Sequence, residues 1–158
     1  MKGFKDFMET KKYVAVIYDD KTQKLLRKWC KENGFDLTKK YSGEDQKEED
    51  FDFHTTIFFT SNELHLKNEE KNVSPSKVTI TGMEMLGLEK DIPVFKVESE
   101  AIMDIRKKYE DMGLEDVWDE YIPHISVSYD KKQRDLEALK LPDFDLYFDK
   151  IVIDDGAA

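Results

Sequence analysis

Cysteine is almost absent from the sequence, which has 158 residues and a single cysteine, Cys30. No internal disulfide can form, and this favours a reducing, cytoplasmic setting in which Cys30 is a buried structural thiol. No cysteine pair exists to build a zinc site. No metal-ligand cluster is visible in the sequence either, and we expect no cofactor. No stretch approaches the roughly 20 apolar residues of a membrane span, and the first residues lack the apolar centre of a signal peptide. These absences predict a cytoplasmic protein without a membrane segment.

Positively charged residues are outnumbered by negatively charged ones. The sequence has 25 Lys and Arg against 35 Asp and Glu, and its formal net charge is −10. A protein that follows a long polyanion gains affinity by releasing counterions with a basic face, and the sequence shows none. We therefore expect no long nucleic acid as partner. A small anionic ligand stays compatible with this charge, because a few local lysines or arginines can set the field inside a cleft.

Glycine and proline are few, 7 and 4 residues, so most of the chain is free to form regular structure. The length fits one domain spanning residues 1–158. Short runs of β-branched and aromatic residues predict strands at 12–18, 51–60, 77–86, 92–98, 121–129 and 146–153. Helices are predicted after Asp19 or Asp20, ending at Asn33-Gly34, and after Ser99, ending at Gly113. Residues 36–50 and 61–76 are predicted to be loops.

Each half of the chain repeats the order strand, helix, strand, and in each half the strand after the helix carries one histidine. Side chains alternate between the two faces of a strand. His54 and Thr56 therefore share one face of their strand, and His124 and Ser126 share one face of theirs, each opposite a more apolar face. Two similar lobes, each offering one strand to a shared cleft, would explain this repeat.

Two imidazoles on either side of a phosphodiester can divide the proton transfers of its cleavage. One removes a proton from the attacking hydroxyl, and the other protonates the leaving oxygen. The hydroxyls of Thr56 and Ser126 can donate to the non-bridging phosphate oxygens as charge develops, and no metal is required. A single His-x-Thr is a weak signal, most often a satisfied strand residue, but two matched copies favour a functional pair. The third histidine, His65, has no hydroxyl at that offset and is interpreted as a surface residue.

The two motifs, His54-Thr55-Thr56-Ile57 and His124-Ile125-Ser126-Val127, resemble the paired H-Φ-[ST]-Φ signature of the 2H phosphoesterase superfamily. Thr55 departs from the apolar residue at Φ, although it is β-branched and lies on the packing face. The resemblance runs from Tyr13 to the last strand. It implies an α+β fold of two pseudo-symmetric lobes, with mainly antiparallel strands and outer helices around a central cleft. It assigns proton transfer to His54 and His124 and phosphate binding to Thr56 and Ser126.

Residues 18–23, 121–130 and 141–144 further resemble a phage branch of this superfamily, the anti-CBASS nucleases, which destroy the cyclic nucleotide messengers of bacterial CBASS immunity. The resemblance implies cleavage of 3′-5′ linkages in cyclic di- or oligonucleotides in the cytoplasm of the host bacterium. Two alternatives stay open: a phosphodiesterase acting on RNA ends, 2′,3′-cyclic or 2′,5′-linked nucleotides, and a nucleotide-binding sponge without turnover. The two intact histidine–hydroxyl pairs weigh against the sponge. Base preference, ring size and homo-oligomerisation are left open.

Three aromatic residues are candidates for stacking on a base: Tyr18, Trp118 and Tyr121. Tyr18 closes the first strand, where it is equally expected as an ordinary strand-end tyrosine. Trp118 and Tyr121 precede the second motif strand, where packing between helix and strand is the competing interpretation.

Overall fold

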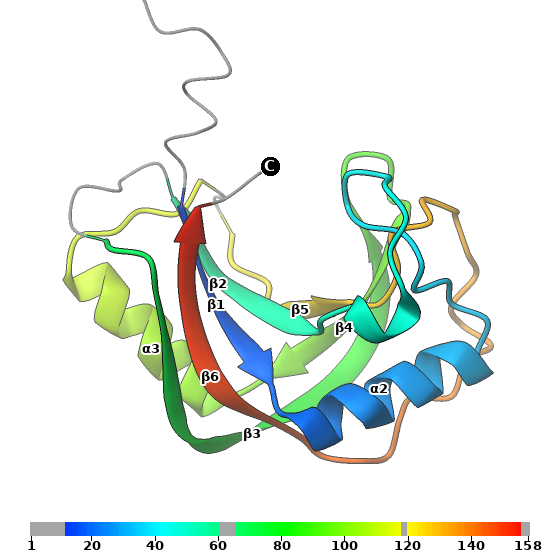
Figure 1. Cartoon of the computed structure of the whole chain (residues 1–158), viewed down its shortest axis with the longest axis horizontal. Coiled ribbons are helices and arrows are strands. Elements are labelled where there is room, and N and C mark those ends of the chain that lie inside the picture. Colours follow the sequence, from blue (N-terminus) through cyan, green and yellow to red (C-terminus); the bar gives the residue numbers. More distant parts are fainter. Residues whose placement is uncertain (1–11, 61–65, 118–119, 156–158) are drawn as a thin grey trace, which may run out of the picture.

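The computed structural model describes residues 12–60, 66–117 and 120–155, and within these ranges the strands form one open sheet. The strand order is β2-β1-β6-β3-β4-β5, and every neighbouring pair is antiparallel (Figure 1). The strands are β1 (Lys12–Tyr18), β2 (His54–Thr60), β3 (Glu69–Leu86), β4 (Ile92–Glu98), β5 (His124–Ser126) and β6 (Leu146–Asp155). The helices are α2 (Asp20–Glu32), α3 (Glu100–Asp111) and a short 3-10 helix (Glu48–Asp50). The predicted α+β class is confirmed, and the two-lobed pseudo-symmetry stays a prediction.

Both predicted helices form where their caps indicate. The Asp19 side chain accepts a hydrogen bond of 2.9 Å from the amide of Thr22 at the start of α2, and Ser99 does the same for Ile102 at the start of α3. Gly34 adopts a φ of 78° just after α2, a left-handed conformation that glycine adopts without steric cost. Cys30 is fully buried on the inner side of α2, as predicted for a structural thiol.

The prediction of a loop over residues 61–76 is wrong for its second part, because β3 begins at Glu69 and runs for 18 residues. Residues 61–65 lie outside the described residues. The first part of β3 pairs with β6 and the second part with β4, so this one strand joins the two ends of the sheet. Pro75 lies where the register with β6 shifts between Asn72 and Ser76, a place where proline removes no ladder hydrogen bond. Residues 69–76 are mostly polar and mostly exposed, so this part of β3 shows no hydrophobic pattern in the sequence.

The two motif strands are shorter than predicted, and the first contains a bulge. Thr56 pairs with Ala15 and Phe58 pairs with Val14, which leaves Ile57 without a partner across from β1. A bulge of this kind reverses the alternation of faces beyond it. Phe58 is therefore buried, as is Ile57, whereas Phe59 is only partly buried. Strict alternation from His54 would place Phe58 on the polar face, and the bulge turns it into the core instead.

Strands β2 and β5 stand at opposite ends of the strand order, yet they contact each other. The sheet curls until its ends meet, and both strands lie near the middle of the molecule in Figure 1, inside the arc of β6, β3 and β4. Two hydrogen bonds join β2 to the segment before β5. The Tyr121 hydroxyl donates to the carbonyl of Thr56 at 2.8 Å, and the Val117 amide donates to that of Phe59 at 2.9 Å. The curl thus brings together the two histidine strands.

In the described part of the chain, no helix is both long and apolar enough to cross a membrane.

Candidate active site

The two motif histidines have the same local geometry, each at the first residue of its strand and each partly buried. Nδ1 of His54 donates to the carbonyl of Asp52 at 3.0 Å, and Nδ1 of His124 donates to the carbonyl of Ile122 at 2.7 Å. A carbonyl can only accept, so Nδ1 carries the proton in both rings. In the neutral ring Nε2 then holds a free lone pair, the form in which an imidazole removes a proton from a hydroxyl.

The electrostatics show that the two imidazoles interact. Burial lowers the pKa of His124 from its ordinary value of 6.5, the hydrogen bond to the Ile122 carbonyl opposes this shift, and the charge of His54 adds to it. His124 is therefore neutral at pH 7. A neutral imidazole with a free Nε2 is suited to act as a general base.

The hydroxyls of the motifs lie two residues further along each strand. Thr56 and Ser126 are both partly buried, on the same strands as the histidines. The side chain of Ser126 hydrogen-bonds the side chain of Tyr129. Thr55, between His54 and Thr56, is fully buried, as expected for its packing face. Each strand therefore presents one histidine and one hydroxyl away from the core.

A pocket of about 330 Å³ opens beside His54. This volume is at the small end of the range for ligand pockets, about 300–1,000 Å³. Its lining combines aromatic rings with polar and charged groups: Tyr13, Ile17, Lys40, Tyr41, Gln46, Asp50, Phe51, Asp52, His54 and Tyr129. Phe51 stacks on Tyr129 with ring centroids 5.5 Å apart, and Tyr41 meets Tyr129 edge-on at 5.7 Å. The pocket thus has a continuous aromatic wall.

Two of these rings were missed by the sequence analysis. Tyr41 belongs to the loop 36–50, which was interpreted as a solvated connection, and Tyr129 follows the second motif strand on its expected packing side. A lone tyrosine directly before a Ser-Gly turn is the only signal that the sequence offers for Tyr41. The position of this ring beside His54 follows from how the loop folds back, which no local pattern encodes.

The three aromatic candidates from the sequence have different surroundings. Tyr18 is 2% exposed, and its hydroxyl shares a hydrogen bond of 2.7 Å with that of Thr55, so its ring lies in the core and not in the pocket. Burial raises the pKa of this hydroxyl. Tyr121 is partly buried under the guanidinium of Arg106, 4.0 Å from its ring centroid. Trp118 and the third histidine, His65, lie outside the described residues.

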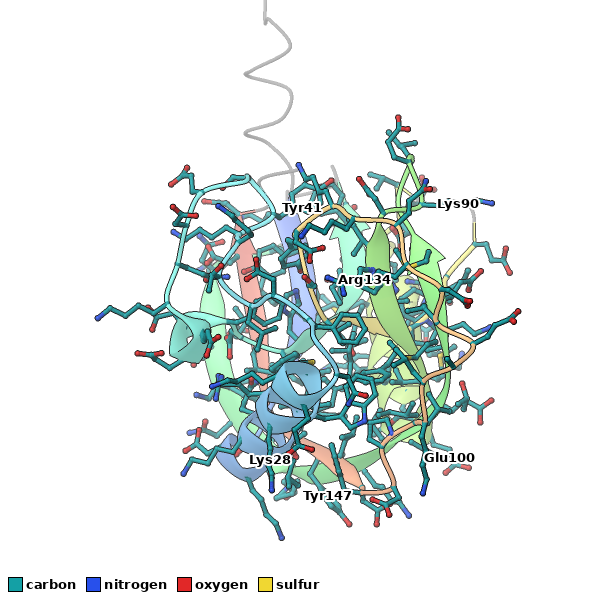
Figure 2. All side chains as sticks on the ribbon, turned by 90° about the vertical axis from the view of Figure 1, so that its right-hand side faces the viewer. Lys28, Tyr41, Lys90, Glu100, Arg134 and Tyr147 are labelled. Carbon is teal, nitrogen blue, oxygen red and sulfur yellow. The ribbon has the colours of Figure 1, made fainter. Side chains whose placement is uncertain are left out.

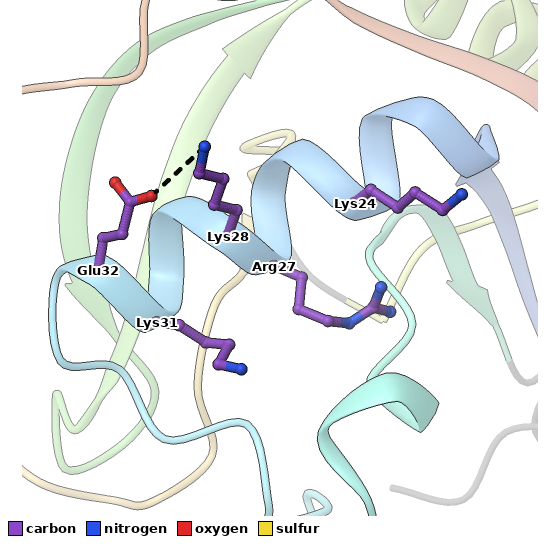
Figure 3. A pocket seen from close by; sticks show the side chains of 5 residues that line it. All are labelled: Lys24, Arg27, Lys28, Lys31 and Glu32. Atoms are coloured by element: carbon purple, nitrogen blue, oxygen red, sulfur yellow. Dashed lines mark ion pairs between the residues drawn. The ribbon is translucent and has the colours of Figure 1, made fainter.

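A second pocket, of about 380 Å³, lies on α2 (Figure 3) and contains no histidine. All of its lining residues come from this one helix: Lys24, Arg27, Lys28, Lys31 and Glu32. Arg27 donates to the backbone carbonyls of the segment that leads to β2, at Glu48, Glu49 and Phe51. Lys31 forms an ion pair with Glu48 at 3.0 Å. These cations hold the protein's own segments, so the pocket beside His54 is the candidate active site.

Among the residues that the structure describes, no group of three or more His, Cys, Asp or Glu side chains could hold a metal ion.

The fold and the site together define an α+β protein in which a curled antiparallel sheet carries two histidine–hydroxyl pairs on strands that contact each other. Of these four residues, His54 lines the aromatic pocket. Residues 10–155 match the family model described as anti-CBASS protein Acb1, and the chain belongs to this family. The family confirms the predicted anti-CBASS relationship and with it a role in evading CBASS immunity. No curated protein sequence is significantly similar to the chain. Membership of the wider 2H superfamily stays a prediction.

Proposed function

We propose that this protein is a metal-independent phosphodiesterase that cleaves 3′-5′ linkages in the cyclic di- or oligonucleotide messengers of CBASS immunity. The observation that carries the proposal is the matched pair of histidines, each with Nδ1 bonded to the carbonyl two residues before it and a hydroxyl two residues after it. Membership of the anti-CBASS family supports the class of substrate. The protein would act in the cytoplasm of the infected bacterium, where these messengers are made.

The proposed reaction begins with attack by the 2′-hydroxyl next to the scissile phosphate. His124, kept neutral by burial, takes the 2′ proton on Nε2, and His54 in its protonated form gives a proton to the departing 5′ oxygen. Thr56 and Ser126 donate to the non-bridging oxygens as their charge grows. The nucleophile is already held beside the phosphorus, so no metal is needed to generate hydroxide. The first product is a linear nucleotide that ends in a 2′,3′-cyclic phosphate.

Tyr121 and Trp118, which precede the second motif in the sequence, remain proposed substrate contacts. Tyr121 also donates its hydroxyl to the carbonyl of Thr56, which fixes the strand that carries the first pair.

The test compares a 3′-5′ linked cyclic dinucleotide with its 2′-deoxy analogue, using the wild type, His54→Ala and His124→Ala. We expect the wild type to cleave only the ribose form and to bind the deoxy analogue as a competitive inhibitor. Each variant should lose about 10²–10⁴-fold in kcat, the usual contribution of one acid–base group. His65→Ala, which changes the third histidine, is the matched control and should keep wild-type turnover.

Three outcomes would contradict the proposal. Cleavage of the all-deoxy ring would show that water attacks directly. A preference for linear RNA, 2′,5′-linked or 2′,3′-cyclic nucleotides would favour another phosphodiesterase activity of the same site. Tight binding without any turnover would identify a sponge.

A further inference from the structure

The segment before β2 contains a small hairpin that forms one side of the pocket beside His54. Three backbone hydrogen bonds of 2.8–2.9 Å close it: Gln46 to Thr38, Lys40 to Glu44 and Gly43 to Lys40. The Lys39 and Asp45 side chains form an ion pair across it. Gly43 adopts a φ of 91°, which lets the chain turn tightly. These contacts make the hairpin a defined element rather than a loose connection.

Tyr41 sits in the turn of this hairpin and has an exposed ring. Its side chain is 53% exposed although it lines the pocket that contains His54. Its edge contact with Tyr129, at an interplanar angle of 88°, fixes the ring on one side. The Lys131 ammonium lies 5.8 Å from the ring centroid, at the outer limit of a cation–π contact. An aromatic ring that is supported at one edge and open to the pocket can bind a flat ligand.

Tyr129, which meets Tyr41 edge-on, links this part of the pocket to the second motif. Tyr129 packs against Phe51 on one side, and its side chain hydrogen-bonds Ser126. The aromatic wall therefore adjoins a hydroxyl of one catalytic pair, while His54 of the other pair lines the same pocket. A nucleotide whose phosphate lies between the two pairs would bring its base within reach of this wall.

The negative charge of the protein makes stacking between a base and an aromatic ring important for substrate affinity. With a formal net charge of −10, and with Asp50 and Asp52 lining the pocket, affinity for a polyanion cannot come from a broad basic surface. Stacking of a base on an aromatic ring does not depend on net charge, and removing one such ring typically weakens binding about 5- to 150-fold per base.

We propose that Tyr41 is a base-stacking residue of this enzyme: one nucleobase of the cyclic nucleotide lies against its exposed ring, which Tyr129 holds by their edge contact. This inference rests on the proposed function, and it adds a residue of the hairpin 38–46 to the substrate site.

The test measures kcat and KM of Tyr41→Ala, Tyr41→Phe and the control Tyr147→Ala on a cyclic dinucleotide. Tyr147 is also a partly exposed tyrosine, 37%, but it lies on β6 at the opposite end of the molecule from Tyr41 (Figure 2). We expect Tyr41→Ala to raise KM about 5- to 150-fold. Tyr41→Phe, which keeps the ring, and Tyr147→Ala should retain the wild-type KM.

A second substrate separates stacking from a general disturbance of the site. The base-free diester 2-hydroxypropyl p-nitrophenyl phosphate carries its own attacking hydroxyl, so its cleavage needs the catalytic pairs but no base contact. Tyr41→Ala should cleave it at the wild-type rate. An unchanged KM for the cyclic dinucleotide in Tyr41→Ala, or an equal loss on both substrates, would overturn the inference.

A binding measurement keeps this inference distinct from the proposed function. A cyclic dinucleotide that contains 2-aminopurine loses fluorescence when its base stacks on an aromatic ring. The wild type and Tyr41→Phe should quench this probe, and Tyr41→Ala should bind it 5- to 150-fold more weakly, by about the same factor as the KM change. If the wild type binds the probe without cleaving any linkage, the proposed function fails while the Tyr41 comparison still decides the inference. If the wild type does not bind it, both are wrong.

Discussion

At the scale of single residues, the two motif histidines share the same backbone contact and differ in their pKa. A carbonyl two residues earlier holds the proton on Nδ1 of each ring and turns Nε2 outward. Burial lowers the pKa of His124, which favours its neutral form at pH 7.

The lowered pKa of His124 makes a prediction about pH. As a general base, His124 works only while it is unprotonated, so its lowered pKa should place the midpoint of the acid limb of kcat/KM below pH 6.5. A pH profile from about pH 5 to 8 on a cyclic dinucleotide checks this. An acid limb with its midpoint at or above 6.5 would contradict the assignment of His124 as the base.

Stability should change with pH in the same direction. When the pH falls through 6.5, the unfolded chain takes up a proton at His124 before the folded one does, so the folded state loses stability until the pH reaches the lowered pKa of the folded form. Above pH 6.5, His124 is mostly neutral in both states, and the folded state keeps its full stability with respect to this group. Thermal melts across this pH range should show that Tm falls less steeply with decreasing pH in His124→Gln than in the wild type.

Tyr18 makes a second residue-scale prediction, which separates a core role from substrate binding. Its buried hydroxyl shares a hydrogen bond with Thr55, so Tyr18→Phe should lower the free energy of unfolding by about 1 kcal/mol. A double-mutant cycle with Thr55→Val, measured by urea unfolding, should return a coupling energy of similar size. KM for a cyclic dinucleotide should stay at the wild-type value. A raised KM without a change in stability would restore Tyr18 to the substrate site.

At the scale of elements, α3 holds the two motif strands in register through one side chain. The Arg106 guanidinium lies between the rings of Phe58 and Tyr121, at 4.3 and 4.0 Å from their centroids. It donates to the carbonyl of Ile57, the bulge residue, at 2.6 Å and to the carboxylate of Asp116 at 2.9 Å. One arginine on α3 thus fixes both the bulge of β2 and the segment before β5.

We therefore expect Arg106→Leu to damage both stability and catalysis. The side chains of Arg106 and Asp116 are 12% and 5% exposed, and removing one partner of a buried ion pair costs about 3–5 kcal/mol. Loss of the contacts to β2 should shift His54 and Thr56, and a misplacement of about 1 Å can lower kcat 10²-fold. Denaturant unfolding and steady-state kinetics measure the two effects.

Two further variants sharpen this test. Arg106→Lys keeps the charge but not the planar fork, so its kcat should lie between those of Arg106→Leu and the wild type. Lys107→Ala is the control from the next position of α3, since its side chain is 73% exposed. Wild-type kcat in a folded Arg106→Leu would show that α3 does not position the site.

At the scale of the whole molecule, the formal net charge of −10 should decide which nucleotides compete for the site. Long single-stranded RNA brings many phosphates near an acidic surface, whereas a small ring brings few. We expect a cyclic dinucleotide to outcompete long RNA, measured as the ratio of kcat/KM at fixed salt. A higher kcat/KM for RNA would favour the alternative activity.

The sequence by itself determined the two motifs and most of the elements. A strand alternates its faces with period two, so the offset between His54 and Thr56, or between His124 and Ser126, already places each pair on one face. The caps Asp19 and Ser99 are equally local signals, and the structure confirms both helices. These features could be predicted because each depends on only a few neighbouring residues.

Only the tertiary structure decided how the pairs meet and what surrounds them. The curl of the sheet, which sets β2 against β5, depends on pairing between strands far apart in the chain. The first part of β3, residues 69–76, is mostly polar and has no hydrophobic pattern, although it joins the predicted strand 77–86 to β6. The bulge at Ile57 and the position of Tyr41 in the pocket likewise arise from contacts with distant segments. Such contacts are specified by packing across the whole core, and a local pattern of residues does not contain them.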